Sequence, residues 1–308
     1  MERRLFLQQT GVVAGAAMIA PSLISAKKKH GKLVILHTND THSNIDPFPV
    51  NHPKFPNMGG VSRRAALIQQ IREQEEHVLL LDAGDIFQGT PYFNKFRGVL
   101  EMKTMGAMNY DIVTLGNHDF DIGMEAYKNA LSHASFKVVN ANYELSSTPL
   151  SEVVLPHTIV QKAGYKIGVF GVGVDLQGLV PNENWKGMTY QDPVQAAQKQ
   201  ADHLKAEGCD LIICLSHLGY EYNTNQVSDK VLAASTSGIN LIIGGHTHTF
   251  LEAMQEFKNK DGQSVFVNQV GYGGLKLGRI DVDMVHEGGK FTIGGLASDN
   301  RFLDEQIA

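Results

Sequence analysis

Apolar residues recur along the chain in two patterns, which predict strands alternating with helices. Short continuous apolar runs, typical of strands buried on both faces, occupy residues 33–37, 77–81, 112–115, 210–215 and 239–243. Apolar positions three or four residues apart predict helices between these runs, at 61–71, 99–108, 123–132, 192–207 and 231–234. The helix at 192–207 starts with Asp192 as its cap and Pro193 at its first position. This alternation predicts an α/β fold.

Further β-rich runs follow, mainly in the second half of the chain. Residues 155–161 and 165–172 flank a turn at Ala163–Gly164 and predict an antiparallel hairpin. Other strands are predicted at 137–139, 264–270, 277–284 and 291–293, with Gly288–Gly289 forming the last turn. Four prolines between Asp46 and Met58 indicate a stiff surface loop. Because neither a repeat nor a linker interrupts the pattern, residues 27–308 are predicted to form one catalytic domain.

The first 26 residues have the pattern of an export signal. Arg3–Arg4 begins a segment that resembles the twin-arginine type, and an apolar stretch at 11–24 follows, with small residues before a run of lysines. We therefore expect residues 1–26 to be a signal peptide that directs the protein to the periplasm or the extracellular space. The apolar stretch is shorter than the roughly 20 residues that cross a bilayer, so no stable membrane anchor is expected. An uncleaved anchor is the alternative.

Composition and charge limit the classes of partner. The chain of 308 residues is 43% hydrophobic and has a formal net charge of −5, without a stripe of lysine or arginine. Binding to a nucleic-acid polymer or an anionic membrane through bulk charge is therefore not expected. Arg63–Arg64 is interpreted as a solvated helix face and not as a phosphate site. Cys209 and Cys214, if extended, lie roughly 16 Å apart, too far for a disulfide, and are predicted to be small buried hydrophobic residues.

Five polar clusters each follow an apolar run. They are Asp40/His42, Asp85, Asn117/His118/Asp121, His217 and His246/His248. Each one alone would be an ordinary polar turn or a surface pair. Side chains at the ends of neighbouring strands converge on one rim of an α/β sheet, however, which is where such folds place their sites. Residues i and i+2 of an extended segment point the same way, so two of these clusters can each present two ligands to one side.

The chemistry of the clusters predicts a metal centre. Imidazole, carboxylate and amide ligands without cysteine suit divalent ions, with Zn or Mn favoured and Fe, Co or Mg as alternatives. The ligands are too many for one ion, and two ions that share a carboxylate would lie about 3.5–4 Å apart. Two ions bring +4 and the carboxylates Asp40 and Asp85 return −2, so about +2 remains to attract a phosphate dianion. The pair would also lower the pKa of a bridging water and give hydroxide near neutral pH.

The same blocks resemble the calcineurin-like metallophosphoesterase superfamily. The segments Asn39–His42, Gly84–Pro91 and Asn117–Asp121 look more narrowly like its 5'-nucleotidase branch, and His217 and Gly245–His248 complete the pattern. The resemblance covers about residues 33–285. It implies a four-layer αββα sandwich of two mixed β-sheets, with a dinuclear metal site at the strand ends.

The resemblance also implies roles for individual residues. It places one ion on Asp40, His42, Asp85 and His248, and the second on Asp85, Asn117, His217 and His246, with Asp85 bridging. His118 would be the catalytic histidine, and Asp121 would fix its ring and tautomer. In this scheme a metal-activated hydroxide attacks phosphorus in line, and Asn117 helps to hold the phosphoryl oxygens. His118 binds the substrate and stabilises the transition state or protonates the leaving alkoxide.

The predicted function is that of an exported dinuclear phosphomonoester hydrolase similar to 5'-nucleotidases, acting on a phosphorylated small molecule, in particular a nucleotide. Hydrolysis of 2',3'-cyclic nucleotides, other phosphodiesters or nucleotide sugars is the alternative, and a thiosulfate-ester hydrolase is a weaker one. A degenerate metal-binding module is disfavoured because every metal position and the pair His118/Asp121 are intact. The branch usually has a second, C-terminal substrate domain, so we expect either a broad phosphatase or a separate chain that supplies this domain, and we favour the second.

Overall fold

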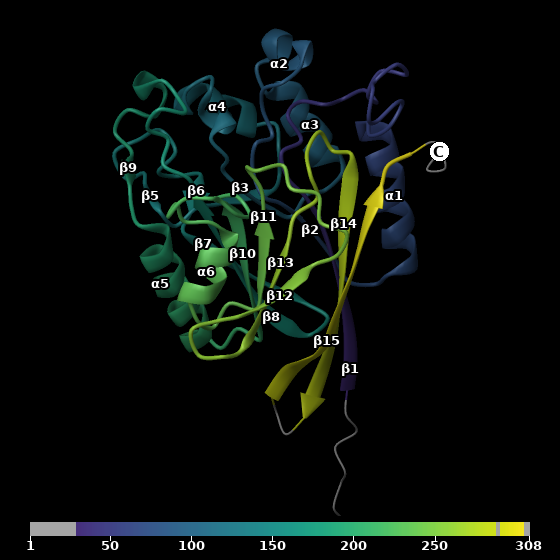
Figure 1. Cartoon of the computed structure of the whole chain (residues 1–308), viewed down its shortest axis with the longest axis vertical. Coiled ribbons are helices and arrows are strands. Elements are labelled where there is room, and N and C mark those ends of the chain that lie inside the picture. The colour runs from purple at the N-terminus through teal and green to yellow at the C-terminus, as the bar shows by residue number, and fades with distance from the viewer. Residues whose placement is uncertain (1–28, 288–289, 305–308) are drawn as a thin grey trace, which may run out of the picture.

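The computed structural model describes residues 29–287 and 290–304, so the predicted signal peptide at 1–26 and the predicted turn at Gly288–Gly289 lie outside the described residues. Two large mixed sheets pack face to face (Figure 1). In spatial order the strands of the first sheet are β15 (Lys290–Phe302), β14 (Lys276–Glu287), β1 (Lys29–Thr38), β2 (Val78–Asp82), β3 (Ile112–Thr114), β4 (Lys137–Val139) and β6 (Val154–Leu155). Those of the second are β12 (Gln255–Lys258), β13 (Ser264–Asn268), β11 (Leu241–Gly244), β10 (Leu211–His217), β8 (Tyr165–Gly173) and β7 (His157–Lys162).

Helices cover the outer face of each sheet. The first sheet packs against α1 (Val61–Gln74), α3 (Val99–Ala107) and α4 (Met124–Leu131), and the second against α5 (Pro193–Ala206) and α6 (Asp229–Ser235). The short helix α2 (Pro91–Phe96) stands above the sheets at the top of Figure 1. Two 3-10 turns (His118–Phe120 and Asn182–Trp185) and a small ribbon of β5 (Tyr143–Glu144) and β9 (Thr189–Tyr190) complete the described elements.

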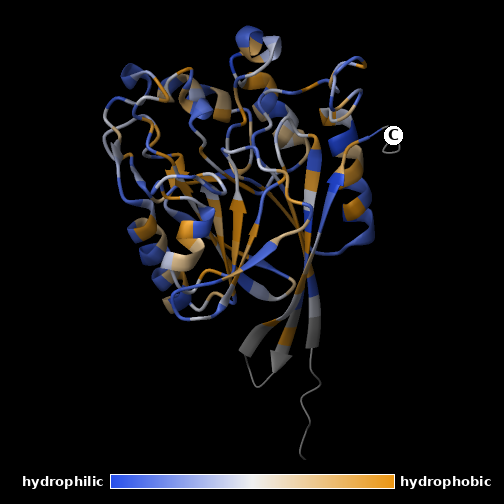
Figure 2. Ribbon diagram, viewed as in Figure 1, coloured by the Kyte–Doolittle hydropathy of each residue, from blue (hydrophilic) through white to orange (hydrophobic). Residues whose placement is uncertain are grey.

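The alternation of side chains along β1 shows how the layers are held together. Leu33 and Ile35 pack between the two sheets, whereas Val34 and Leu36 face the helices, and all four are completely buried. The strands of the second sheet divide their side chains in the same way between the inter-sheet core and α5 and α6. Figure 2 shows the resulting hydrophobic centre. The predicted four-layer αββα sandwich of two mixed sheets is therefore confirmed.

Most of the predicted elements are present, with shifted ends. The side chain of Asp192 accepts a hydrogen bond from the backbone N–H of Gln195 and caps α5 as expected. Leu155, predicted in the hairpin strand, instead belongs to β6 in the other sheet, and the hairpin strand β7 begins only at His157 after Pro156. Strand β12 was not predicted, and β15 is much longer than its predicted core at 291–293.

The predictions for the arginine pair Arg63–Arg64 and for the two cysteines have different outcomes. The solvated face predicted at Arg63–Arg64 is wrong for Arg64, which is 3% exposed and lies against the backbone at Gly274. Arg63 donates hydrogen bonds to the backbone carbonyl groups of Asn57 and Gly59. Cys209 and Cys214 are free thiols, and Cys214 is buried as predicted, but Cys209 is only half-buried, so the prediction of a buried residue is wrong there. Within residues 29–287 and 290–304, none of the helices combines the length and apolar character that a membrane crossing requires.

Candidate metal centre

The structure brings six of the predicted ligands together at the carboxyl ends of β1, β2, β10 and β11. They form two groups, each with its ligand atoms within 4.8 Å of one another: Asp40, His42 and His248 in the first, and Asp85, His217 and His246 in the second. The parallel pairing of β1 with β2, and of β10 with β11, places these chain segments at one rim. The convergence predicted from strand ends therefore exists in the fold.

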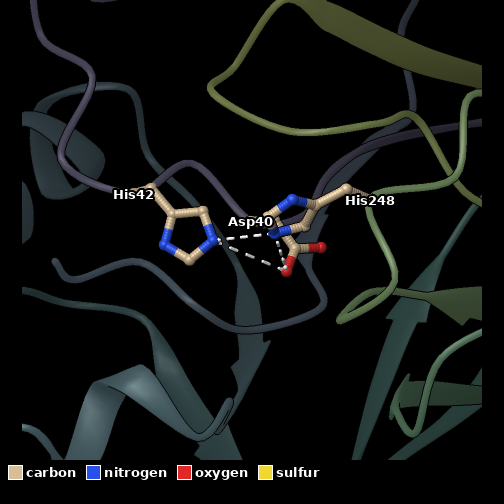
Figure 3. Close-up of side chains that lie close together, drawn as sticks. All are labelled: Asp40, His42 and His248. Atoms are coloured by element: carbon tan, nitrogen blue, oxygen red, sulfur yellow. Dashed lines mark hydrogen bonds and ion pairs between the residues drawn. The ribbon is translucent and has the colours of Figure 1, made fainter. Parts of the chain in front are cut away.

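The first group points three electron-donating atoms at one place (Figure 3). Nε2 of His248 lies 3.4 Å from Oδ1 of Asp40 and 3.0 Å from Nε2 of His42. His42 donates from Nδ1 to the carbonyl oxygen of Phe87 at 3.1 Å, which leaves a lone pair on its Nε2. Two imidazole nitrogens that face each other across a carboxylate fit a shared cation better than they fit each other.

The second group is deeper. The side chain of His217 is completely buried, and its Nδ1 donates to the carbonyl oxygen of Ala83 at 2.7 Å. Its Nε2 is also buried, makes no hydrogen bond, and lies 3.1 Å from Oδ2 of Asp85. Nδ1 of His246 lies 2.8 Å from Oδ1 of Asn117. Because buried polar atoms are nearly always paired, a buried Nε2 whose nearest polar neighbour is a carboxylate fits a metal ligand, and an ion would lie between these residues.

Asp85 connects the two groups. Its Oδ2 lies 3.8 Å from Nε2 of His42 in the first group and 3.1 Å from Nε2 of His217 in the second. Its Oδ1 accepts a hydrogen bond from the backbone N–H of His118 at 2.8 Å. Burial alone would raise the pKa of Asp85, but the attraction of His217 and His42 outweighs burial and lowers it. The carboxylate is therefore ionised and lies beside histidines of both groups.

The metal-free pKa of His217 fits the same picture. Burial lowers the pKa of this imidazole, but the negative charge of Asp85 overcomes burial and raises it to about 10. Without a metal, a proton therefore occupies the ring nitrogen that faces Asp85. A bound cation would replace this proton, because metal ligation requires the lone pair. The donor set of imidazole, carboxylate and amide fits divalent metals at both groups.

Five of the six grouped residues have left-handed backbone conformations, which ordinary residues rarely adopt. Their φ angles are 49° at Asp40, 46° at His42, 56° at Asp85, 74° at His246 and 53° at His248. Each such residue costs roughly 1–3 kcal/mol and persists only where the surrounding structure enforces it. The enforcing contacts include hydrogen bonds from the N–H of Asp40 to Gly84 O at 2.9 Å and from the N–H of His246 to Oδ1 of Asp40 at 3.0 Å.

Glycine is required where two of these turns meet. A Cβ atom at Gly116 would lie 2.2 Å from Oδ1 of Asp85. One at Gly84, where φ is 91°, would lie 2.5 Å from the backbone nitrogen of Gly116. Both glycines therefore allow the β2 and β3 turns to approach closely enough to place Asp85 beside Asn117.

His118 lies beside the two groups and belongs to neither. Its Nδ1 is 2.8 Å from Oδ2 of Asp121, and its ring meets His42 edge-on with 5.4 Å between the centroids. The hydrogen bond that Nδ1–H of His118 donates to Asp121 is the main cause that raises the pKa of His118, with burial acting against it. One third of the His118 side chain is exposed. A protonated imidazole at the edge of a metal centre can donate a proton to a departing oxygen.

Asp119 is a supporting residue to which the sequence analysis assigns no role. Its carboxylate is 1% exposed and accepts hydrogen bonds from the backbone N–H groups of Gly116 at 2.8 Å, Asp85 at 3.1 Å and Ile86 at 3.0 Å. It thereby joins the β2 turn to the β3 turn. The available signal was its place three residues after Gly116, a spacing at which a side-chain carboxylate can bond back to the backbone.

The aromatic stretch 87–96 is divided between two environments. Phe87 and Phe93 are buried and pack in the core, whereas Phe96 is 39% exposed on α2. The histidines interpreted as structural stay outside both groups: His37, His77, His133, His157 and His203. His37, for example, is completely buried, and its Nε2 lies 2.9 Å from Nδ2 of Asn268.

Comparison with known proteins agrees with this geometry. The family profile of calcineurin-like phosphoesterases matches residues 33–250. The 5'-nucleotidase of Crotalus adamanteus venom is 35% identical over 227 residues, which are 71% of this chain and 37% of the relative, so the chain spans well under half of its length.

Solved structures show the same likeness. A 5'-nucleotidase precursor from Thermus thermophilus superposes with a TM-score of 0.81 at 32% identity, covering 90% of this chain and 55% of the other. The NAD nucleotidase of Haemophilus influenzae gives 0.73 at 28% identity, with 87% of this chain and 50% of the other covered.

Proposed function

This chain belongs to the calcineurin-like phosphoesterase family, and from that premise we propose that it is an exported dinuclear phosphomonoester hydrolase of the 5'-nucleotidase type. The observation that carries the proposal is the position of Asp85, whose Oδ2 faces ligands of both groups while its Oδ1 accepts from the N–H of His118. A single shared carboxylate between two histidine-containing groups suits a pair of ions that act on one phosphoryl group.

Seven residues would hold the two ions. The proposed ligands are Asp40, His42, Asp85 and His248 for the first ion, and Asp85, Asn117, His217 and His246 for the second. When bound, two divalent ions supply positive charge for the phosphoryl oxygens and lower the pKa of water. Zn or Mn is favoured by the donor set, and Fe, Co and Mg are the alternatives.

The catalytic roles of the chain itself fall to His118, Asp121 and Asn117. Asp121 bonds Nδ1 of His118 and so fixes the ring, which leaves Nε2 to carry the proton for the leaving oxygen. Asn117 is 4% exposed beside His246, and its amide can orient the phosphoryl group as well as hold metal. In this scheme no side chain of the protein becomes phosphorylated.

The favoured substrates are nucleoside 5'-monophosphates. The support is the likeness to proteins named 5'-nucleotidase, together with a site that recognises the phosphoryl group all such substrates share. The likeness to a NAD nucleotidase favours one second candidate, hydrolysis within a dinucleotide or another phosphodiester. A separate chain that supplies a substrate domain stays a prediction.

A substrate panel tests the proposal. Purified protein is assayed with AMP, an aryl phosphate, a 2',3'-cyclic nucleotide and NAD, after elemental analysis of its metal content, and the His118→Asn protein serves as the control for contaminating phosphatase. We expect two ions per chain and the highest kcat/KM on a monophosphate. Preference for NAD or the cyclic nucleotide would favour the second candidate. Absence of turnover on all four substrates with both ions bound would refute the hydrolase.

Export rests on Arg3–Arg4 and is tested separately. Replacement of both arginines by lysine is expected to leave the precursor in the cytoplasm, because the segment resembles a signal that requires the pair. Cell fractionation measures the outcome. An unchanged distribution would show that the protein does not use this route.

A further inference from the structure

We propose that Tyr272 is a positioning residue, which holds the ring of His248 in place for the first ion by stacking against it. The proposal rests on the proposed function, because it needs His248 as a metal ligand. It concerns a residue outside the five polar clusters, in the loop that precedes β14.

His248 lacks the backbone anchor that two of the other proposed histidine ligands have. His42 and His217 each donate from Nδ1 to a backbone carbonyl, those of Phe87 and Ala83. Metal-bound histidines usually have such a partner, which sets the plane of the ring. Among the described residues, the polar contacts found for the His248 ring are with His42 and Asp40, two other proposed ligands. Its side chain is also 41% exposed, so burial alone does not fix it.

Tyr272 supplies the missing constraint. Its ring stacks on that of His248, with 5.0 Å between the centroids and 21° between the planes. Phe48, Phe55 and Phe250 meet Tyr272 nearly at right angles, with centroids 6.2, 6.4 and 5.8 Å away. Aromatic pairs at these separations prefer defined orientations. The tyrosine ring is thus held by three phenylalanines and can in turn define the plane of His248.

The backbone connects Tyr272 to the same half of the centre. The N–H of Gly273 donates to Asp40 O at 2.7 Å, and Asn39 Nδ2 donates to Gly271 O at 2.6 Å. The N–H of Gly271 donates to Thr249 O at 2.9 Å, one residue after His248. The loop that carries Tyr272 is therefore bonded to both segments that carry ligands of the first group. Gly271 and Gly273, with φ of 79° and 65°, permit this path on either side of the tyrosine.

The test measures Zn²⁺ affinity by chelator competition, with elemental analysis of the stoichiometry. We expect Tyr272→Ala to bind one of its two ions about 10- to 100-fold more weakly, the usual loss when a supporting partner of a ligand is removed. Tyr272→Phe should stay within about twofold of the wild type, because the ring is kept and the hydroxyl is not required. Tyr272→Leu fills the space without a flat ring, so it should lose the same affinity as Tyr272→Ala. It also provides the measurement if the alanine protein does not fold.

A double-mutant cycle decides whether Tyr272 acts through His248. In a His248→Ala background, Tyr272→Ala should weaken Zn²⁺ no further, because the ring it positions is gone. Tyr190→Ala, which removes a half-buried tyrosine whose ring is tilted against that of Tyr143 in the β5–β9 ribbon, is the matched control and should keep both ions. Equal losses in both backgrounds, or normal affinity in Tyr272→Ala and Tyr272→Leu, would overturn the proposal. Wild-type protein that binds fewer than two ions would instead overturn the dinuclear function, and this inference with it.

Discussion

The two halves of the centre differ in how the protein holds them. In the second group, the side chains of Asp85 and His217 are 2% and 0% exposed, lie at the ends of core strands, and are bonded to backbone groups. In the first group, His248 is 41% exposed and depends on a loop and a stacked ring. The comparison shows that both halves follow core strands, but that the first includes an exposed ligand candidate, His248, which a loop holds in place. We therefore expect the first ion to exchange more readily than the second.

The largest effect should follow from a change that the two halves share. Asp85→Asn removes the negative charge of a carboxylate that faces both groups, so both ions should bind more weakly. Activity is expected to fall by about 10⁴-fold or more, the upper end of what one catalytic group costs. Elemental analysis and steady-state kinetics measure the two outcomes. If this protein retains both ions at full affinity, the sharing of Asp85 is wrong.

His118→Asn should separate chemistry from metal binding. Because His118 lies in neither ligand group, both halves should keep their ions. The loss of the proton donor should lower kcat by about 10²–10⁴-fold. If the substituted protein loses a metal ion, His118 is a ligand and belongs to one of the two groups.

A pair of ligand substitutions measures the difference between the halves directly. His217→Ala leaves Asp85 buried without its partner, so the metal-free protein should lose about 1–3 kcal/mol of unfolding free energy. His248→Ala changes an exposed side chain and should cost no more than about 0.5 kcal/mol. Urea unfolding in the presence of a chelator gives both values. Equal costs would contradict the distinction between a buried ligand in the second half and an exposed ligand in the first.

The smallest effect concerns pH. The hydrogen bond that His118 donates to Asp121 raises the pKa of His118, so the protonated form persists to higher pH. If that form donates the proton, activity is lost as the pH rises through this pKa. Asp121→Asn removes the negative charge, lowers the pKa, and should move the alkaline limb of the kcat profile to lower pH, with roughly a tenfold loss of kcat. If the alkaline limb does not move, it reports the titration of a side chain other than His118.

Much of the fold could be predicted because the core strands are continuous apolar runs. Elements without that signal could not. Strand β12 is exposed and contains Gln255, Glu256 and Lys258, and β15 contains Gly294 and Gly295 in place of an apolar run. Both are strands because a neighbour pairs with them along their length, a tertiary effect that propensity does not contain.

The residues of the site also divide into those that the sequence predicts and those that it does not. The six grouped ligands could be predicted, because each follows a strand and strand ends converge. Arg64 and Tyr272 could not, since the burial of the first and the ring contact of the second arise where loops meet segments far away in the chain. Asp119 lies within a recognised block, but its four backbone donors come from two separate turns.

The left-handed backbone at five ligand positions has a consequence for attempts to make this protein more heat-resistant. Asp40 and Asp85 are buried and have partners that glycine would leave unpaired. At His246 and His248, which are not buried, glycine would relieve the strain, since it alone adopts such φ angles without steric cost. A selection for melting temperature alone in metal-free medium would therefore favour loss of these side chains. The same selection with Zn²⁺ present would reward keeping them, because a bound ion stabilises the folded chain. The presence of metal in the medium would thus decide whether selection for thermal stability preserves or removes the side chains of the site.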